Sequence, residues 1–207
     1  MTVFDQCALE YDQWFDDNPS LYQAEINAVR RFIPSNSLGV EIGVGSGRFA
    51  APLGIWSGVE PSHNMAEIAA RRGIAVCQAI GEWLPFSSSG FDFVLLVTVI
   101  CFVDNPVVLL KETSRVLRPE GRLILGFIDK NSPLGQRYEA SKENNPFYRE
   151  AHFYSTEQVS SFVRQAGFEK VTFCQTILSH TSEESDVDQV LDGYGEGGFI
   201  VLNTSKG

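Results

Sequence analysis

The chain has 207 residues, of which 43% are hydrophobic and 20% are charged, so it can bury one substantial core and is expected to form a single domain. Its formal net charge is −10 and no Lys or Arg precedes Arg30, which disfavours a nucleic-acid partner because phosphates require basic surface. No apolar run approaches the ~20 residues of a membrane helix, and the N-terminus lacks the basic region of a signal peptide. These features argue against a membrane protein and predict a cytoplasmic one.

The first 36 residues are expected to form two helices. Residues 5–15 and 20–33 have helical character, and in the second helix apolar residues recur at near-helical spacing until Pro34 closes it. Because both helices precede the first predicted strand, residues 1–36 are interpreted as an N-terminal helical lid.

Short apolar runs then alternate with helical segments over residues 37–129. Strands that alternate with helices predict right-handed crossovers and a parallel sheet covered on both faces. The predicted strands are residues 38–42, 55–60, 74–79, 91–97 and 122–128.

Capping residues predict where two of the intervening helices begin. Ser62 is expected to cap a helix that runs to Arg72. Asp104, with Pro106 in the first turn, is expected to open another helix that reaches Leu117.

The C-terminal part is expected to add an antiparallel edge. A helix that begins at the capping box of Ser155 and Gln158 is followed by two apolar runs, residues 170–178 and 199–203, with no helix between them. The predicted fold class is therefore α/β. We expect a Rossmann-like doubly wound sheet of about seven strands, mostly parallel with an antiparallel edge strand, and helices on both faces.

Cysteines and histidines are scattered along the sequence. The four cysteines show none of the paired spacings of a zinc site or a disulfide framework, and the three histidines form no ligand motif. We therefore expect no metal site and reduced thiols. The cysteines are Cys7, Cys77, Cys101 and Cys174.

The strongest functional signal is the segment VEIGVGSGRF at residues 40–49, in which a buried strand runs into a glycine-rich turn and then a helix. Glycines let the backbone turn tightly and approach a ligand, and a helix N-terminus offers unpaired N–H groups to it. A dinucleotide fingerprint requires glycine or alanine three residues after Gly45, where this chain has Arg48. This difference argues against a nicotinamide-dependent oxidoreductase.

Glu60 ends the second predicted strand, about twenty residues beyond Glu41. A carboxylate at this position can accept hydrogen bonds from the adjacent hydroxyls of a ribose. The alternative interpretation is a solvated acid at a strand end.

Five segments together resemble the class I S-adenosylmethionine (SAM)-dependent methyltransferases, particularly the small family that includes quinone-biosynthesis C-methyltransferases. They occur in family order between residues 38 and 128, and the joint match is more specific than any single motif. The resemblance implies the fold and SAM as the cofactor. The segments are residues 41–47 (EIGVGSG), 60–62 (EPS), 81–86 (GEWLPF), 91–94 (FDFV) and 117–122 (LRPEGR).

The resemblance also implies roles for individual residues. Gly43, Gly45 and Gly47 would pass beneath the methionine part of SAM, with Glu41 near its ammonium group and Glu60 on the ribose. Residues 81–83 would border the adenine, and residues 98–99 would line the sulfonium and methyl group. The remaining cofactor-binding candidates are Pro61, Met65, Gly81, Glu82, Trp83, Thr98 and Val99, with Met65 either on the adenine face or simply in the core.

The segment after the fourth predicted strand departs from better-known relatives. Amide and DNA N-methyltransferases of similar fold carry Asn or Asp, then Pro-Pro and an aromatic residue, whereas residues 97–102 here are VTVICF. Exocyclic base amines are therefore poor acceptor candidates, and the mouth of the site is expected to be apolar. Ile100 and Phe102 are either contacts at this mouth or parts of the core.

Residues 130–154 are interpreted as a substrate-side insertion and residues 155–207 as a C-terminal helix with a strand pair, both completing a core over residues 37–129. Aromatic residues of the lid and of this insertion would either stack on a flat acceptor or bury themselves in the core. Tyr11 and His152 are weak candidates for catalysis, and no base is assigned. The lid aromatics are Tyr11, Trp14, Phe15 and Tyr22.

The sequence thus predicts a SAM-dependent methyltransferase that acts on a small-molecule acceptor, with amines and aromatic compounds as candidates. An acidic loop at residues 183–188 would favour an amine, or it is a solvated hairpin loop. The alternative function is a non-catalytic SAM-binding regulatory module. A monomer and a homodimer are both compatible with the sequence.

Overall fold

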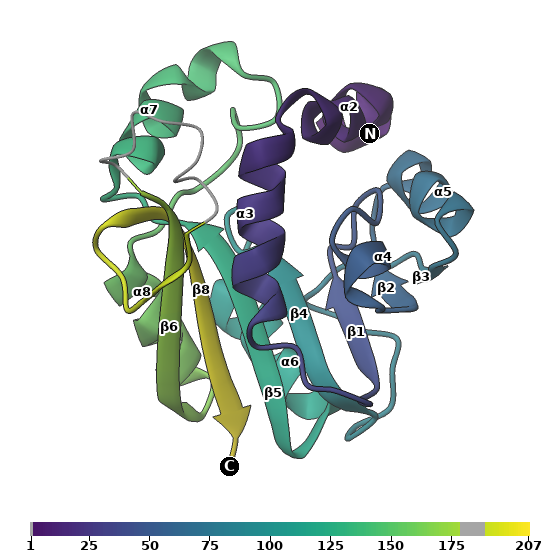
Figure 1. Ribbon diagram of the computed structural model, residues 1–207. Helices are drawn as coiled ribbons and strands as arrows, with labels where there is room; N and C mark the ends of the chain where they lie inside the picture. The colour runs from purple at the N-terminus through teal and green to yellow at the C-terminus, as the bar shows by residue number, and fades with distance from the viewer. Residues whose placement is uncertain (1, 179–188) are drawn as a thin grey trace.

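The computed structural model describes residues 2–178 and 189–207 and is centred on one mixed β-sheet (Figure 1). Eight strands of the described residues pair in the order β3-β2-β1-β4-β5-β8-β6-β7. Strands β1 to β5 are parallel, whereas β8 pairs antiparallel with both β5 and β6. The strands are β1 Gly39–Ile42, β2 Ser57–Val59, β3 Ala75–Cys77, β4 Phe91–Val97, β5 Leu117–Ile128, β6 Phe168–Leu178, β7 Leu191–Asp192 and β8 Gly197–Lys206.

Helices cover both faces of the sheet. Figure 1 shows α3 in front of the sheet and α6 and α8 behind it, while α2 and α7 lie at the top of the view. The helices are α1 Val3–Gln6, α2 Ala8–Asp17, α3 Pro19–Arg30, α4 Ala50–Leu53, α5 His63–Arg71, α6 Pro106–Val116, α7 Pro133–Ser141 and α8 Thr156–Gln165, with a 3-10 turn η1 at Lys142–Asn144.

Strand β4 shows how the sheet separates two hydrophobic cores. Successive side chains of a strand point to opposite faces. Phe93, Leu95 and Val97 accordingly pack in the core beneath α3, while Val94 and Leu96 pack in the core that contains residues of α6 and α8. The predicted doubly wound α/β fold with an antiparallel edge is confirmed. The short β7 raises the predicted seven strands to eight.

The helix that was predicted over residues 5–15 is two helices. A capping box between Thr2 and Asp5 holds the four-residue α1, and Cys7 (φ −121°, ψ 31°) leaves helical geometry before α2 begins. The side chain of Asn64 on α5 donates a hydrogen bond to the backbone oxygen of Asp5, which fixes α1 against α5.

The predicted helix after the glycine-rich turn is present as the four-residue α4, which begins at Ala50 after further turns. One prediction about a helix start needs correction. Asn105, not Asp104, caps α6, since its side-chain oxygen accepts the Val108 N–H at 3.1 Å. The predicted caps at Ser62 and Ser155 are confirmed.

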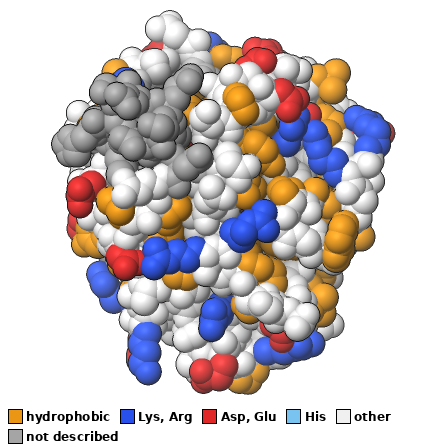
Figure 2. Space-filling model, viewed as in Figure 1, with side chains coloured by type: hydrophobic (Ala, Val, Ile, Leu, Met, Phe, Trp, Pro, Cys, Tyr) orange, Lys and Arg blue, Asp and Glu red, His pale blue; other side chains and the backbone are white. Residues whose placement is uncertain are grey.

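Helix length and surface charge bear on membrane and nucleic-acid partners. No helix in the described part of the chain combines the length and apolar composition that crossing a bilayer requires. On the face drawn in Figure 2, the coloured Lys and Arg side chains are spread among acidic and uncharged residues. The predicted acidic loop at residues 183–188 lies outside the described residues.

Candidate functional site

A cavity of about 310 Å³, called the strand-end cavity below, is lined by the segments that follow the parallel strands β1 to β4. Strand β4 returns to pair with β1 on the side opposite β2, and such switch points leave a crevice at the carboxyl edge of an α/β sheet. Among the predicted site residues, those that line the cavity are Tyr11, Gly43, Gly45, Glu60, Pro61, Met65, Gly81, Glu82, Thr98 and Val99. Those outside its wall are Glu41, Gly47, Trp83 and His152.

The three glycines after β1 do different things, although all have positive φ. A Cβ on Gly43 would lie 2.4 Å from Cγ2 of Val99, and one on Gly47 would lie 2.5 Å from Cδ1 of Ile74. Gly43 and Gly47 are therefore needed for close packing of the loop. Gly45 (φ 54°) has no atom within 4 Å of a Cβ position and lines the cavity, so a ligand can approach its backbone closely.

Glu60 directly follows β2, is only 7% exposed and contacts the loop after β1. Its Oε2 accepts the Gly45 N–H at 2.9 Å and its Oε1 accepts the Ser62 N–H at 2.9 Å. Burial raises the pKa of this carboxyl, and these two hydrogen bonds oppose the rise. Each carboxylate oxygen keeps a further lone pair for a ligand hydroxyl, as a ribose-binding acid requires.

Glu41 is buried on β1 behind the cavity wall, with 2% of its surface exposed. Its Oε2 has no hydrogen-bond partner among the described residues. Burial raises the pKa of the carboxyl well above its usual value, a backbone hydrogen bond at Ala50 opposes this, and the nearby Glu60 adds to it. An acid with one unsatisfied oxygen at this position fits the predicted cationic group of a ligand.

The opposite wall follows β3 and includes part of α5. Met65 is 1% exposed and lines the cavity, so it belongs both to the core and to the wall. Glu82 accepts the backbone N–H of Asp104 at 3.1 Å, which joins the segments after β3 and β4. Trp83 is 80% exposed and lies outside the wall, in contrast to its predicted place beside Gly81.

Thr98, directly after β4, connects this cavity to a second one. Its φ of 53° is unusual for a residue with a Cβ, and its N–H donates to the Gly126 oxygen at 2.8 Å. Tyr11 interacts through its hydroxyl with the Thr98 side chain. Thr98, Tyr11 and Phe147 line both cavities, so the two meet at these side chains.

The second cavity, called the aromatic cavity below, measures about 400 Å³. Its wall comes from α2, α3, the chain around η1 and Phe49 at the start of α4. The ring-bearing residues that line it are Tyr11, Trp14, Phe15, Phe49, Tyr138, Phe147 and Tyr148. Of the predicted lid aromatics, Tyr11, Trp14 and Phe15 line this cavity, whereas Tyr22 packs against the hydrophobic core and lines neither cavity. Phe15 also belongs to the core, since it is only 5% exposed.

His152, the other predicted catalytic candidate, has an exposed side chain and lines neither cavity. Its backbone N–H donates to the Cys101 oxygen at 2.8 Å, so its recorded contact is structural.

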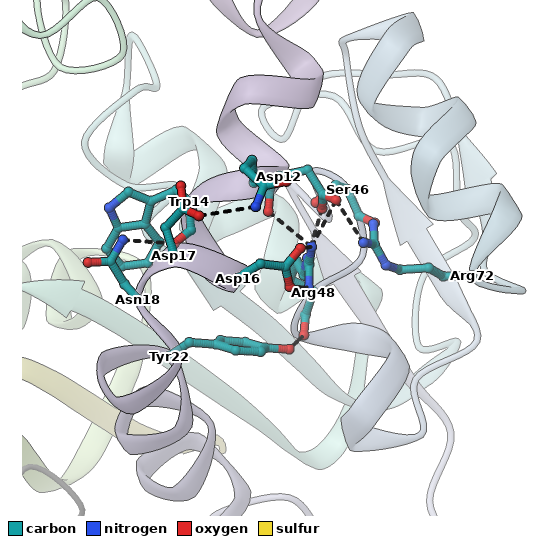
Figure 3. A network of polar contacts seen from close by, with 10 residues as sticks. Asp12, Trp14, Asp16, Asp17, Asn18, Tyr22, Ser46, Arg48 and Arg72 are labelled. Atoms are coloured by element: carbon teal, nitrogen blue, oxygen red, sulfur yellow. Dashed lines mark hydrogen bonds and ion pairs between the residues drawn. The ribbon is translucent and has the colours of Figure 1, made fainter.

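Arg48 ties the N-terminal helices to the glycine-rich segment (Figure 3). Its guanidinium donates to the carboxylates of Asp12 at 2.8 and 2.9 Å and of Asp16 at 2.8 and 2.7 Å. Arg72 adds an ion pair to Asp12 at 2.8 Å, and the Tyr22 hydroxyl donates to the Arg48 backbone oxygen. The residue that departs from the dinucleotide fingerprint therefore fixes the lid to the loop.

Sequence reasoning missed two kinds of residue in these walls. Phe4 lines the strand-end cavity from α1, and the pattern of the N-terminus gave no signal for it. Glu25 lines the aromatic cavity from α3. A signal existed for Glu25, because it shares the buried side of α3 with Ala28 and Val29.

Comparison with known proteins identifies the family. Residues 40–125 match the methyltransferase domain family. The crystal structure of a SAM-dependent methyltransferase from Thermotoga maritima, described as a possible histamine N-methyltransferase, is 47% identical with a TM-score of 0.94, covering 99% of this chain and 98% of that one. An uncharacterised protein of Methanocaldococcus jannaschii is 45% identical over 100% of both chains. The demethylmenaquinone methyltransferase of Lactococcus lactis is more distant, at 24% identity over 75% of this chain and 60% of its own.

The matched domain spans the strands and loops that build the strand-end cavity. Similarity to the Thermotoga and Methanocaldococcus proteins extends over essentially the whole chain, including the N-terminal helices. The chain belongs to the family of S-adenosylmethionine-dependent methyltransferases, and S-adenosylmethionine is its cofactor.

Proposed function

We propose that this methyltransferase binds SAM in the strand-end cavity and transfers its methyl group to a small-molecule acceptor in the aromatic cavity. The observation that carries the proposal is the meeting of the two cavities at Thr98, Tyr11 and Phe147. A second cavity that begins where the first ends gives an acceptor access to the methyl group. A regulatory module that only bound SAM would not need such a cavity.

The chain supplies the cofactor site through backbone and carboxylate groups. Glu60 would accept the ribose hydroxyls while Gly45 keeps the loop open to the ligand, as the resemblance implies. Gly43 and Gly47 would hold the loop in place, and Pro61, Met65, Gly81, Glu82 and Val99 would enclose the cofactor. Glu41 would compensate the ammonium group from behind the wall, and Trp83 would need to rotate inward to reach the adenine.

Positioning is the main catalytic task of the protein. When SAM is bound, it supplies a methyl group already activated by a positively charged sulfur. Thr98 and Tyr11 lie at the junction and would hold the acceptor in line, an effect worth ~7–11 kcal/mol when orientation is good. Burial raises the pKa of the Tyr11 phenol, so it stays protonated at neutral pH and would serve as a hydrogen-bond donor to the acceptor rather than as a base.

The size and chemistry of the aromatic cavity favour a small organic acceptor. Its volume of about 400 Å³ lies within the range of small-molecule sites, and its wall is dominated by rings and other apolar side chains. A flat apolar group can stack on these rings. Cytoplasmic location and a monomeric or homodimeric state stay predictions, the latter to be measured by size-exclusion chromatography with light scattering.

The proposal is tested by calorimetric titration with SAM, S-adenosylhomocysteine and NADH. We expect binding of the first two and none of NADH. Glu60→Gln removes the charge that would hold the ribose and should weaken binding at least tenfold, whereas Glu169→Gln, an exposed acid on β6, should have no effect. Equal affinity in the wild type and Glu60→Gln, or tight NADH binding, would contradict the proposed site.

A further inference from the structure

Glu25 is a buried acid that the cofactor site does not use. It lies in the middle of α3, is 7% exposed and lines the aromatic cavity. No hydrogen bond or ion pair to its carboxylate is recorded within residues 2–178 and 189–207. An unpaired buried carboxylate is costly, so a protein that retains one in a cavity wall generally has a use for it.

The rest of the aromatic cavity offers this acid no positive partner. Its lining residues, all in the described part of the chain, include no Lys, Arg or His. Arg48 lies over the Phe15 ring at 5.7 Å, but its guanidinium is already paired with Asp12 and Asp16. Glu10 and Asp17 add two exposed acids to the wall. The cavity is therefore lined by acids and has no positively charged side chain in its described wall.

The aromatic side chains around Glu25 suit a cation as well. Ring faces attract cations, most strongly where water is excluded. Tyr138 and Tyr148 stack with their centroids 4.9 Å apart, and Trp14 and Phe15 are in edge contact at 5.2 Å. Rings and one carboxylate in a common wall form the combination that recognises organic ammonium ions.

We propose that the aromatic cavity takes an acceptor that carries an ammonium group, and that the Glu25 carboxylate is the counter-ion of this group. The inference rests on the proposed function, because it assigns the acceptor class of the same site. Glu25 lines the aromatic cavity but not the strand-end cavity, so in this proposal the ammonium group lies in the aromatic cavity while SAM occupies the strand-end cavity.

This placement restricts the chemistry of the acceptor. A protonated amine has no free lone pair and cannot attack a methyl carbon. The atom that is methylated near Thr98 is therefore a second nucleophile of the same molecule, whose lone pair forms the new bond to carbon while sulfur keeps the electron pair of the bond that breaks. Glu25 is a binding residue in this scheme and takes no proton from the reacting atom.

The state of Glu25 before binding adds a measurable signature. Burial raises the pKa of its carboxyl to about 8, so the group is mostly protonated in the free protein at pH 7. The phenols that face it, Tyr11 on α2, Tyr138 on α7 and Tyr148, have pKa values raised by burial and stay neutral at this pH. Binding of an ammonium ion should then release up to about 0.9 proton per site at pH 7.

Two matched ligand series test the proposal by calorimetry in the presence of S-adenosylhomocysteine, which prevents turnover. The first is tyramine, tyrosol and 4-hydroxyphenylacetate, and the second is histamine, imidazole-4-ethanol and imidazole-4-acetate. The wild type should bind an amine at least tenfold more tightly than its alcohol counterpart, with proton release detected in buffers of different ionisation enthalpy. The carboxylates should bind most weakly.

The variants are Glu25→Gln, which keeps the shape of the side chain, and Glu169→Gln as the matched surface control. Glu25→Gln should reduce the preference for amine over alcohol to about twofold and abolish proton release, while its affinity for S-adenosylhomocysteine stays unchanged. The control should behave as the wild type.

Different results would overturn the proposed function and the proposed ammonium acceptor. Loss of S-adenosylhomocysteine binding by the wild type would overturn the proposed function. Normal binding of that ligand would overturn the present inference alone if no amine bound, if alcohols or carboxylates bound as well as amines, or if Glu25→Gln kept the amine preference.

Discussion

The two cavities that meet at Thr98 are built in different ways. The strand-end cavity takes its wall mainly from short segments directly after consecutive parallel strands. The aromatic cavity is assembled from the consecutive helices α2 and α3 and from the chain around η1, which is far from them in sequence. Motifs of a few residues can specify the first kind of site, whereas the second exists only after the helices have packed.

The buried acids in the two cavity walls also differ in how the chain holds them. Both Glu60 and Glu25 are 7% exposed. Glu60 is held by two backbone N–H groups at 2.9 Å, so its position is fixed by the loop that it serves. Glu25 has no recorded polar partner among the described residues, and burial alone shifts its pKa. The chain itself thus satisfies Glu60 in the strand-end cavity. In the aromatic cavity, its described part leaves Glu25 without a polar partner, which a ligand could supply.

The largest expected effect is on the strand-end side. Gly43→Ala should lower the free energy of unfolding by about 3–4 kcal/mol, because a Cβ at φ 70° would lie 2.4 Å from Val99. Gly193→Ala is the control, since its φ of 82° imposes similar backbone strain but no atom lies within 4 Å. Urea denaturation should show a cost of only about 1–2 kcal/mol for the control. Equal costs would show that the loop yields to the methyl group.

The next effect is the pH dependence of stability that Glu25 causes in the aromatic cavity. The Glu25 carboxyl has a pKa of about 8 when folded and an ordinary value of 4.5, so between these pH values the folded state holds a proton that the unfolded chain has lost. Wild-type stability should therefore fall as pH rises from 4.5 to 8, by about 3–4 kcal/mol. Glu25→Gln should remove this contribution and be more stable than the wild type at pH 8.

Thermal unfolding of both proteins at pH 5 and pH 8 measures this difference. Glu169→Gln serves as control and should follow the wild type at both pH values. A Glu25→Gln variant with the same pH dependence as the wild type would mean that the carboxyl titrates normally, and the contrast with Glu60 would then disappear.

The smallest effect concerns the connection between the two regions. Arg48→Lys keeps the charge but loses the paired contacts to Asp12 and Asp16, and should cost about 1 kcal/mol. Arg118→Lys, which alters a more exposed pair with Asp92, should cost less. Because Arg48 joins α2 to the glycine-rich segment, we also expect weaker binding of S-adenosylhomocysteine in Arg48→Lys only. Unchanged affinity of Arg48→Lys for S-adenosylhomocysteine would show that the contact of Arg48 with α2 does not influence ligand binding at the glycine-rich segment.

The sequence predicted best what depends on local patterns. Residues 91–97 were predicted as a strand and form β4, since a buried apolar run bounded by turns needs little tertiary information. The start of β5 at Leu117 was missed because polar and proline residues interrupt its pairing with β4. The break at Cys7 was missed because it depends on contacts of α1 with α5 rather than on a helix-breaking residue.

The site divides along the same line. Nine of the predicted residues line one cavity because the segments after parallel strands must meet at one edge of the sheet, and Tyr11 joins them from α2. Trp83 and His152 belong to segments whose other residues line the cavities, but their own side chains are exposed and line neither. The direction of a side chain depends on packing that sequence spacing does not encode. Glu25 could be found only by knowing which helix lines the aromatic cavity, which the assembled fold supplies.

Helix α3 has a consequence for how this enzyme could change its substrate during evolution. The residues beside Glu25 on α3 are core residues, for Ala24, Ala28 and Val29 are 0% exposed. An acceptor preference carried by a surface loop can be altered by insertion or exchange of that loop without disturbing the fold. If Glu25 binds the acceptor as proposed, a new residue at position 25 must also be compatible with the packing of α3. Mutational routes to a new acceptor would then be few, and descendants with a neutral acceptor should differ at several positions of this helix together.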